Sequence, residues 1–551
     1  MIFATFEGLG LSTIGKLPEN QHVETLNFSS NAIQTYWPDP FSQIRKLKRL
    51  SFAHNDLTEI TPDLFTNIDQ LEDLDLSYNK LYDFNPLDFK YLARVKKFNL
   101  QSNQLKKIPL EALQSMISLE DLDLSKNNIY DLLLQKKDNL PMLKILNLSG
   151  NRIRSITRDS FPDSNNIELV DLSNNVIEIV EDDAFLKCTN LRELNLAQNN
   201  ITFSFDFPPS LQVITLRINR MHSWPRFPSG IKLIDMSYNR LQGIYDESVT
   251  ELHNLEYLDI SGNQLKDFTI NKQLNSLLSL KLSFNLLQEI PQSINNEMFP
   301  LLHVLTLDGN PIETIYFKKP ITLEILSLTE LNNVRVIEKR AFSNVAPRIV
   351  ENYEDNCFSL FLSNCPSLEV ISDGAFDDTS LCMLDISGNN LTSISRDLLD
   401  WSKLNEGINL QFNPWDCSCD MQWILDELLP KMIRSNSRLL AEFRCHSPRG
   451  YEGLRLVHFY NWTEKAMCDG PSDNFLLDVG SGQKVSSLTL VLVGIIVVGL
   501  LVIVVLIVYL IRNRKRYRLR QAALKRKRQS LRDSKNSCEL HKEQFSALNR
   551  M

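Results

Sequence analysis

A nine-residue pattern recurs along this chain and limits its possible folds more than any other feature. Leu71-Glu-Asp-Leu-Asp-Leu-Ser-Tyr-Asn79 has the form L-x-x-L-x-L-x-x-N, and 17 copies lie between residues 23 and 413. The asparagines that end the first eight copies are spaced 24 residues apart, from Asn31 to Asn199. A period of this length marks stacked units that bury their apolar faces against one another. The sequence therefore predicts an α/β solenoid, a curved horseshoe with a parallel β-sheet on its concave face.

Each column of the repeat has a physical role. Alternation along the L-x-L core places Leu74 and Leu76 inside and Asp75 outside. The sharp turn that follows buries backbone groups that no strand pairs. An asparagine amide has two donors and an acceptor, so Asn79 and its equivalents are expected to serve their own turn and the neighbouring one. A second column is expected to form an aromatic spine under the convex side: Phe41, Phe65, Phe89, Phe161, Phe185, Phe342 and Phe376.

Three features interrupt the regular repeat. After Asn199, two successive copies are only 20 residues long and contain prolines, so we expect a local change in curvature there. Two later copies carry Leu331 and Cys365 in place of the asparagine. Residues 345–356 are too many for one turn and are expected to bulge as a loop. Loops on rigid scaffolds often bind partners, although an inserted loop without a role is equally compatible with the sequence.

Residues 1–22 precede the first full copy. They contain neither the basic n-region nor the apolar h-region of a signal peptide. Leu9-Gly-Leu-Ser-Thr-Ile14 instead resembles the end of a segment that caps a first repeat. We therefore expect a partial N-terminal cap and an internal Met1. The alternative is a true start at Met1, with the apolar C-terminal helix acting as a reverse signal-anchor.

A group of cysteines directly follows the last repeat. The run Asn413-Pro-Trp-Asp-Cys-Ser-Cys-Asp-Met-Gln-Trp423 resembles the C-terminal cysteine-rich flank of extracellular leucine-rich repeat proteins, here residues 414–468. In that family the first cysteine pairs with the third and the second with the fourth, which implies the pairs Cys417–Cys445 and Cys419–Cys468. Disulfides imply an oxidising compartment outside the cytosol. A zinc site is not expected, because no histidine pair lies at ligand spacing.

The earlier cysteines are less informative. Cys188 is expected to be a buried free thiol. Cys357 and Cys365 lie at opposite ends of one extended segment and are not expected to pair with each other. The state of both, and of Cys382, stays open.

Five Asn-x-Ser/Thr sequons agree with secretion. Two of them, Asn27 and Asn147, occupy the outward position of the L-x-L core, so their glycans are expected on the concave sheet, where they would obstruct a ligand. The full set of predicted glycosylation sites is Asn27, Asn147, Asn200, Asn390 and Asn461.

The C-terminal part has the sequence of a membrane anchor. Residues 469–487 form a polar stalk, and residues 488–511 contain no charge. A helix of that length, at about 1.5 Å per residue, exceeds the roughly 30 Å apolar core of a bilayer. Residues 512–551 carry a surplus of 11 positive charges, which leaves −19 on the rest of a chain whose net charge is −8. We therefore expect one transmembrane helix with a cytoplasmic basic tail against anionic lipid, and the acidic body argues against nucleic acid as a partner.

Carboxylates occupy the outward strand positions of the even repeats. No sequon lies between Asn27 and Asn147 to cover them. They are expected to face a basic partner surface and to speed its association, or else to serve only as solubilising charge. These predicted partner-binding residues are Asp73, Asp75, Asp121, Asp123, Asp171 and Glu193.

The sequence contains no catalytic motif: no G-x-S-x-G, no phosphate-binding glycine loop and no H-E-x-x-H. We expect neither enzymatic activity nor a cofactor. Residues 20–511 resemble single-pass leucine-rich repeat receptors and adhesion proteins, of the kind of Capricious, Tartan and Toll-like receptor ectodomains. That resemblance implies a plasma-membrane protein with an extracellular N-terminal part that binds an extracellular protein in adhesion or guidance. The alternatives are an innate-immune receptor that signals through an associated chain, and a lateral co-receptor.

The expected orientation is directly testable. If residues 488–511 span the membrane as described, protease added to intact cells removes the repeats and spares a tag placed after Met551. Immunoblotting of the tag after digestion measures this. Loss of the tag from intact cells would show the reverse orientation.

Overall fold

The computed structural model describes residues 2–134, 140–162, 165–244, 249, 251–349, 356–459, 465–468, 476–479 and 483–486. The chain divides into two compact units, Met1–Trp462 and Thr463–Met551. Among the described residues, no helix has the length and apolarity needed to cross a membrane. The predicted transmembrane segment 488–511, the basic tail 512–551 and the sequon at Asn461 all lie outside them.

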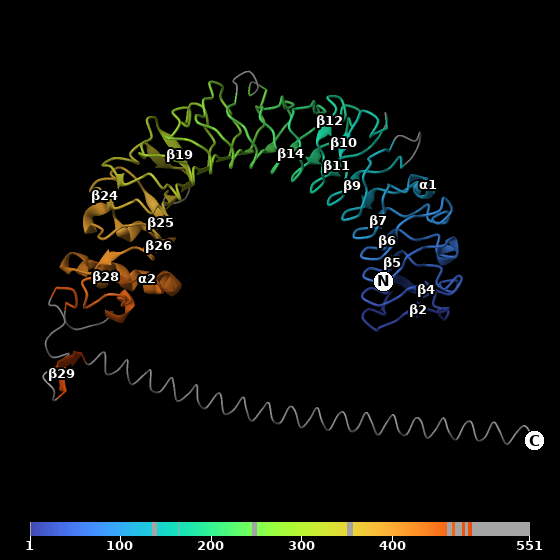
Figure 1. Cartoon of the computed structure of the whole chain (residues 1–551), viewed down its shortest axis with the longest axis horizontal. Coiled ribbons are helices and arrows are strands. Elements are labelled where there is room, and N and C mark those ends of the chain that lie inside the picture. The colour runs from blue at the N-terminus through green and yellow to red at the C-terminus, as the bar shows by residue number, and fades with distance from the viewer. Residues whose placement is uncertain are drawn as a thin grey trace, which may run out of the picture. The chain divides into compact units, whose positions relative to one another are not determined.

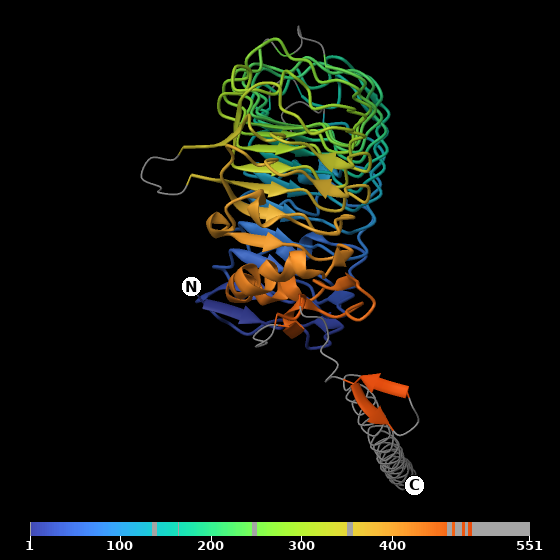
Figure 2. The same ribbon diagram turned by 90° about the vertical axis from the view of Figure 1, so that its left-hand side faces the viewer.

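The first unit is a curved solenoid built on one parallel sheet, whose stacked strands are visible in Figure 2. Each of the 17 copies supplies one strand, and β1 (Ile2–Thr5) adds an eighteenth. The strands line the inner side of the arc in Figure 1. In order from β1 they are β3 (Val23–Asn27), β5 (Arg49–Ser51), β6 (Asp73–Asp75), β7 (Lys97–Asn99), β8 (Asp121–Asp123), β9 (Ile145–Asn147), β11 (Leu169–Asp171), β13 (Glu193–Asn195), β14 (Val213–Thr215), β15 (Leu233–Asp235), β16 (Tyr257–Asp259), β17 (Ser279–Lys281), β18 (Val304–Thr306), β20 (Ile325–Ser327), β23 (Phe358–Phe361), β25 (Leu381–Asp385) and β26 (Gly407–Asn409).

The remaining elements are short, and the described part contains less helix than an α/β class suggests. The α-helices are α1 (Leu110–Leu113) and α2 (Leu429–Asn436). A π-helix, η6 (Ile424–Leu428), directly precedes α2. The 3-10 helices are η1 (Pro62–Phe65), η3 (Arg396–Leu398), η4 (Trp401–Lys403), η5 (Cys419–Met421), η7 (Ser437–Leu440) and η8 (Leu456–Phe459). Parallel pairs are β2 (Thr13–Ile14) with β4 (Thr35–Tyr36), β10 (Ser155–Ile156) with β12 (Ile179–Val180), β19 (Ile321–Leu323) with β22 (Val345–Pro347), β21 (Val336–Ile337) with β24 (Val370–Ile371), and β27 (Trp415–Asp416) with β28 (Cys445–Ser447). Within the second unit, β29 (Leu476–Val479) and β30 (Gln483–Ser486) form an antiparallel pair in the segment predicted as a stalk.

The asparagine ladder has the expected geometry. Asn127 is buried, and its Nδ2 donates to Leu124 O at 3.0 Å within its own repeat and to Leu100 O at 2.9 Å in the preceding one. Its Oδ1 accepts the N–H of Leu105 at 3.0 Å. The residue before each ladder asparagine takes a left-handed conformation, with φ of 53° at Lys126. One amide therefore joins the turns of two repeats.

The ladder is interrupted where Leu331 and Cys365 replace asparagine. Leu331 has no polar side-chain atom, and Cys365 Sγ makes only the weak hydrogen bonds of a thiol, at 3.6 Å to Leu328 O of the preceding repeat and 3.6 Å to Ser363 O of its own turn. In this region the main sheet is reinforced by a disulfide between Cys357 and Cys382, which join adjacent repeats with their Cα atoms 5.3 Å apart. Part of the predicted loop is ordered as well, because β22 pairs with β19; residues 350–355 lie outside the described part.

The N-terminal segment continues the solenoid. β1 pairs in parallel with β3, the ring of Phe6 stacks on Phe28 at 4.9 Å, and Asn31 Nδ2 donates to Phe6 O at 2.8 Å. These are the contacts of one repeat with the next. The expectation of a partial cap at residues 1–22 did not include this strand, because its sequence lacks the L-x-x-L-x-L frame.

The interior is filled as the repeat pattern requires. Every member of the predicted phenylalanine column is buried, and neighbouring rings pack against each other. The ring centroids are 6.1 Å apart for Phe65 and Phe89 and 5.5 Å apart for Phe161 and Phe185. In the two short repeats, a stack of Phe207 on Phe227 at 5.2 Å takes the corresponding space. Cys188 is a buried free thiol, and burial raises its pKa to about 12.

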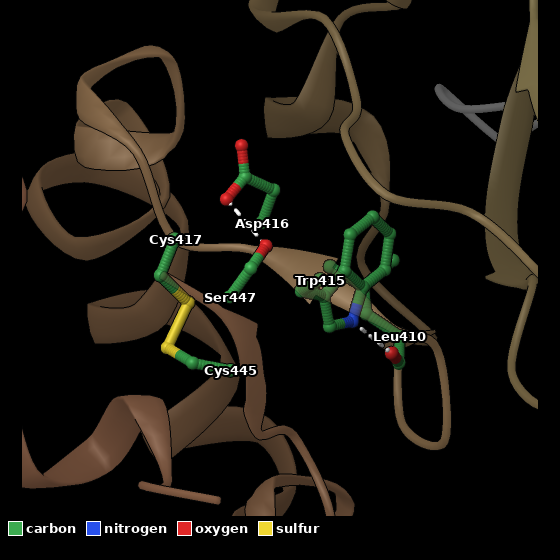
Figure 3. Close-up of a disulfide and its surroundings, with 6 residues drawn as sticks. All are labelled: Leu410, Trp415, Asp416, Cys417, Cys445 and Ser447. Atoms are coloured by element: carbon green, nitrogen blue, oxygen red, sulfur yellow. Dashed lines mark hydrogen bonds between the residues drawn. A yellow bond between two sulfur atoms is a disulfide. The ribbon is translucent and has the colours of Figure 1, made fainter. Parts of the chain in front are cut away.

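The end of the first unit is closed by the cysteine-rich flank (Figure 3). Trp415 is fully buried and its Nε1 donates to Leu410 O at 2.8 Å, while Ser447 Oγ donates to Asp416 at 2.5 Å. Cys417 and Cys445 form a disulfide, the pair that the resemblance implies. Cys419 and Cys468 are also disulfide-bonded, and their pairing with each other stays a prediction.

The ladder predicts the cost of losing one amide. Asn127→Ala leaves the buried carbonyls and the Leu105 N–H unpaired, so we expect the free energy of unfolding to fall by about 1–3 kcal/mol. Chemical denaturation of the full-length protein measures the change. The matched control is Asn128→Ala, at the next, half-buried position, for which we expect a much smaller loss. Equal effects of the two substitutions would contradict the role of the ladder.

Candidate functional site on the concave face

The outward aspartates of the strands close a turn, a role that the sequence analysis missed. Asp75 Oδ1 accepts the N–H of Ser77 at 2.9 Å, and Asp123 Oδ1 accepts that of Ser125 at 2.8 Å. Asparagine does the same at this position, as Asn99 does for Gln101. The recurrence of Asp or Asn two residues before the turn is the sequence signal for it. The other residues with this contact are Asn27, Asn147, Asp171, Asn195, Asp235, Asp259, Asp385 and Asn409.

Four of the six predicted partner-binding carboxylates lie together. Asp73 and Asp75 of β6 and Asp121 and Asp123 of β8 lie on either side of β7, from which Lys97 projects between them. They line a shallow depression of about 240 Å³. Lys97 lies between the four carboxylates and Arg49 of β5 lies beside Asp73, so the site keeps an excess of negative charge.

The charges in this acidic cluster are not independent. Burial raises the pKa of Asp73 above its ordinary value, and the neighbouring Asp75 adds to the effect, while Lys97 opposes it. Burial also raises the pKa of Asp121, with Lys97 opposing and Asp123 adding. Among the described residues no group of histidine, cysteine, aspartate or glutamate side chains has the arrangement of a metal site.

Asp171 and Glu193 do not join the acidic cluster. Strand β9 separates them from β8, and its outward residues are the exposed Ile145 and the half-buried Asn147. Asn147 Nδ2 donates to Asp123 Oδ2 at 3.2 Å. The sequon at Asn147 therefore directly abuts the acidic cluster, so the absence of an intervening sequon does not keep the cluster clear of glycan.

A wider depression of about 530 Å³ extends the acidic cluster toward the N-terminal strands. Asp73 and Asp75 line both depressions. Asn27, Arg49 and His54 line the wider one, so a glycan on Asn27 would stand inside it. The sequons Asn200 and Asn390 lie elsewhere, each directly after a ladder asparagine on the flank of the solenoid.

An apolar row adjoins the acidic cluster on the other side. Ile145 of β9 is the register partner of Asp121 in β8, and Leu169 of β11 is the register partner of Ile145. Beyond Glu193, the row continues with Val213 and Leu233. A solvated sheet face has polar residues at such positions, and an apolar strip with a charged border is the composition of a protein interface.

A third outward row has alternating charges that pair across the strands. Lys48 contacts Glu24 at 3.4 Å, Lys96 contacts Glu72 at 3.6 Å, and Lys144 contacts Glu120 at 2.8 Å. Lys232 and Glu256 continue the pattern at 3.2 Å. Exposed pairs of this kind contribute little to stability, and they cancel each other's charge. This row therefore adds little net charge to the concave face.

The raised pKa values predict how the acidic cluster affects stability. Groups whose folded pKa is raised contribute stability that is fully present below the ordinary pKa and is lost as the pH rises through the folded value. We therefore expect Asp73→Asn with Asp121→Asn to raise the melting temperature at pH 7, with the gain shrinking as the pH falls toward 3.8, the ordinary value. Thermal unfolding between pH 4 and pH 8, with Asp171→Asn as a control outside the cluster, measures this. A lower melting temperature at pH 7 would mean that the two carboxylates stabilise the fold.

Sequence comparisons match repeat families over most of the solenoid. A leucine rich repeat family matches residues 45–105, 93–153, 141–201 and 209–265, and a BspA type leucine rich repeat region (6 copies) matches residues 310–412. Epiphycan of Gallus gallus is 34% identical over 148 residues, covering 25% of this chain and 46% of its own length. Osteomodulin of Bos taurus is 27% identical over 228 residues, covering 35% and 53%. The chain thus spans about half the length of the curated relatives it matches.

Solved structures also resemble the chain. A leucine-rich repeat protein of Leptospira interrogans is 20% identical with a TM-score of 0.46 and covers 80% of this chain and 93% of its own. The leucine-rich repeat domain of APL1B is 24% identical with a TM-score of 0.42, covering 62% and 94%. The repeat families match more than half of the residues, and their frame coincides with the observed strands and ladder. The chain belongs to the leucine-rich repeat proteins.

Proposed function

We propose that this chain is a cell-surface recognition protein whose concave face binds an extracellular protein. The observation that supports it is the acidic cluster of Asp73, Asp75, Asp121 and Asp123 around Lys97. Charge that served solubility alone would be spread apart, whereas here burial and neighbouring carboxylates oppose the ionisation of two members. An arrangement that costs stability is typical of a functional surface.

The two parts of this face have complementary roles in the proposal. The acidic cluster attracts a basic partner surface and increases the association rate. The apolar row that begins at Ile145 and Leu169 then provides area to bury, which lengthens the lifetime of the complex. Adhesion or guidance remains the preferred biological setting. Residues 488–511 serve in this proposal as a single transmembrane anchor, and the basic tail lies against anionic lipid. The disulfides are consistent with an extracellular solenoid.

The substitution that tests the acidic cluster has to preserve the turn. Asp75→Lys would remove the acceptor of the Ser77 N–H, so a loss of binding would be confounded by a loss of structure. Asp75→Asn with Asp123→Asn keeps both acceptors, as Asn99 shows in the strand between them. The matched control is Asp171→Asn with Asp235→Asn, which removes the same charge from the same column outside the acidic cluster.

The experiment first finds a partner by screening the full-length protein against a panel of cell-surface ectodomains, and then measures association rates by surface plasmon resonance. We expect the Asp75/Asp123 variant to associate several-fold more slowly at low salt, with the difference shrinking as salt shortens the range of the charges. The control variant is expected to match the wild type. Equal rates for all three proteins would reject the acidic cluster as the docking surface.

The sequon at Asn147 offers a second test of the same surface. Ser149→Ala abolishes the sequon but keeps Asn147. It also keeps the backbone N–H of residue 149, which donates to Asn147 Oδ1. Because a glycan at Asn147 would stand next to Asp123, we expect the unglycosylated protein to associate faster with the same partner. Mass spectrometry of the peptide establishes occupancy, and an unchanged rate at full occupancy would place the docking surface away from Asp123.

A further inference from the structure

A second surface lies on the flank of the solenoid that follows the asparagine ladder. Here exposed and buried residues alternate, so Leu105 and Ile129 point inward while Lys106 and Tyr130 point outward. The backbone of successive repeats is hydrogen-bonded, with the N–H of Tyr130 donating to Lys106 O at 3.4 Å and that of Arg152 to Ile129 O at 2.7 Å. Side chains of one column are therefore spaced about 4.7–4.9 Å apart per repeat along the solenoid.

One exposed column of this flank alternates aromatic rings with cations over four successive repeats. Its members are Tyr82, Lys106, Tyr130 and Arg154, and the two tyrosines are 60% and 49% exposed. Around Tyr130 the surface is hollowed into a depression of about 750 Å³, to which Arg152 of the neighbouring column also contributes. We call this depression and the four-residue column the basic flank.

The cations of the basic flank are unpaired in the part of the chain that the structure describes. Lys106, Arg152 and Arg154 have no carboxylate within ion-pair distance there. Two exposed carboxylates lower the net charge of the basic flank without forming an ion pair with these cations: Glu178, which follows Arg154 in the same column, and Asp131, which adjoins Tyr130. On the concave side of the same repeats, by contrast, each lysine of the alternating row has a glutamate partner. Residues 1–511 carry a net charge of −19, so a local excess of positive charge adds nothing to their solubility.

We propose that the basic flank binds a sulfated linear polysaccharide. The guanidinium groups of Arg152 and Arg154 bind sulfate oxygens in pairs, and Lys106 binds a further sulfate along the chain. The exposed ring of Tyr130, between the cations of its column, packs against the apolar face of a sugar ring. The depression is shallow and open, and its lining residues come from four successive repeats, so it runs along the solenoid axis as a linear chain would.

Features of the flank disfavour two other polyanions. An acidic peptide that bound as an added strand would need free backbone groups, whereas those of the flank are used between repeats, as at Arg154 O with the N–H of Glu178 at 2.9 Å. Single-stranded nucleic acid also recognises alternating aromatic and basic residues. It is disfavoured by the disulfides, which require an oxidising compartment, and by the acidic body.

The test uses the full-length protein and an immobilised heparin oligosaccharide. Lys106→Gln, Arg152→Gln and Arg154→Gln together remove three positive charges from the basic flank, and we expect affinity to fall by about tenfold or more. The matched control is Lys96→Gln, Lys144→Gln and Lys232→Gln, which removes the same charge from the paired concave row. We expect it to lose less than about twofold. Equal losses for the two variants would overturn the proposal, because only the overall charge would then matter.

Two further measurements separate polysaccharide recognition from general anion binding. Tyr130→Ala is expected to weaken heparin binding several-fold and Tyr130→Phe to retain it, because only the alanine removes the ring. Competition with single-stranded DNA of equal charge is expected to be much weaker than competition with heparin. Unchanged affinity of a folded Tyr130→Ala variant, or equal competition by the DNA, would overturn the assignment to a sugar ligand. Asp75→Asn with Asp123→Asn should leave heparin binding intact, so the two surfaces are tested independently.

Discussion

The amide of each ladder asparagine determines how the repeats are placed. At Asn127 it joins a carbonyl of its own turn to a carbonyl and an N–H of the preceding repeat, in a buried position where unpaired groups would be costly. To reach these partners, the residue before it adopts a left-handed conformation. Because the same set of bonds recurs from repeat to repeat, equivalent residues form straight columns. Any surface of the solenoid is therefore described by what each column contains, and both proposed surfaces are columns of this kind.

The interruption of the ladder shows how the fold compensates for a missing amide. Leu331 offers no hydrogen bond, and Cys365 offers a thiol whose pKa is raised to about 11 by burial, so it remains a neutral, weak donor. The same region contains the Cys357–Cys382 disulfide between neighbouring strands and two extra parallel pairs, β19 with β22 and β21 with β24. A covalent link and added backbone hydrogen bonds thus replace the side-chain amides over two repeats. The two short repeats keep their ladder asparagines, so no hydrogen bond of the turn has to be replaced. There the stacked rings of Phe207 and Phe227 fill the interior of the shorter repeats.

The period predicts the fold well, because the spacing of leucines and asparagines reports directly on strands and turns. Contacts between columns are harder to predict. Asp171 follows the same pattern as Asp123, but strand β9 with Ile145 and Asn147 lies between them, so a position within the repeat does not by itself show which carboxylates are neighbours. The Cys357–Cys382 bond joins adjacent repeats at a sequence separation of 25, one residue out of step with the repeat, so the repeat pattern gave no basis for pairing the two residues. β1 was missed for a related reason: its contacts with β3 are made largely by the backbone and Phe6, outside the leucine frame.

The columnar arrangement also explains how one short arc can present surfaces of opposite charge. Asp121 and Lys106 belong to adjacent repeats, but the first projects from the concave strand and the second from the flank beyond the ladder. The buried leucines and the ladder asparagine lie between these two positions and fix the side chains on different faces. Charges on the two faces are therefore kept from collapsing into ion pairs, unlike the alternating Glu and Lys row, whose members lie side by side on one face. Segregation of charge by column, and not the net charge of the chain, therefore determines the local electrostatic potential of each face.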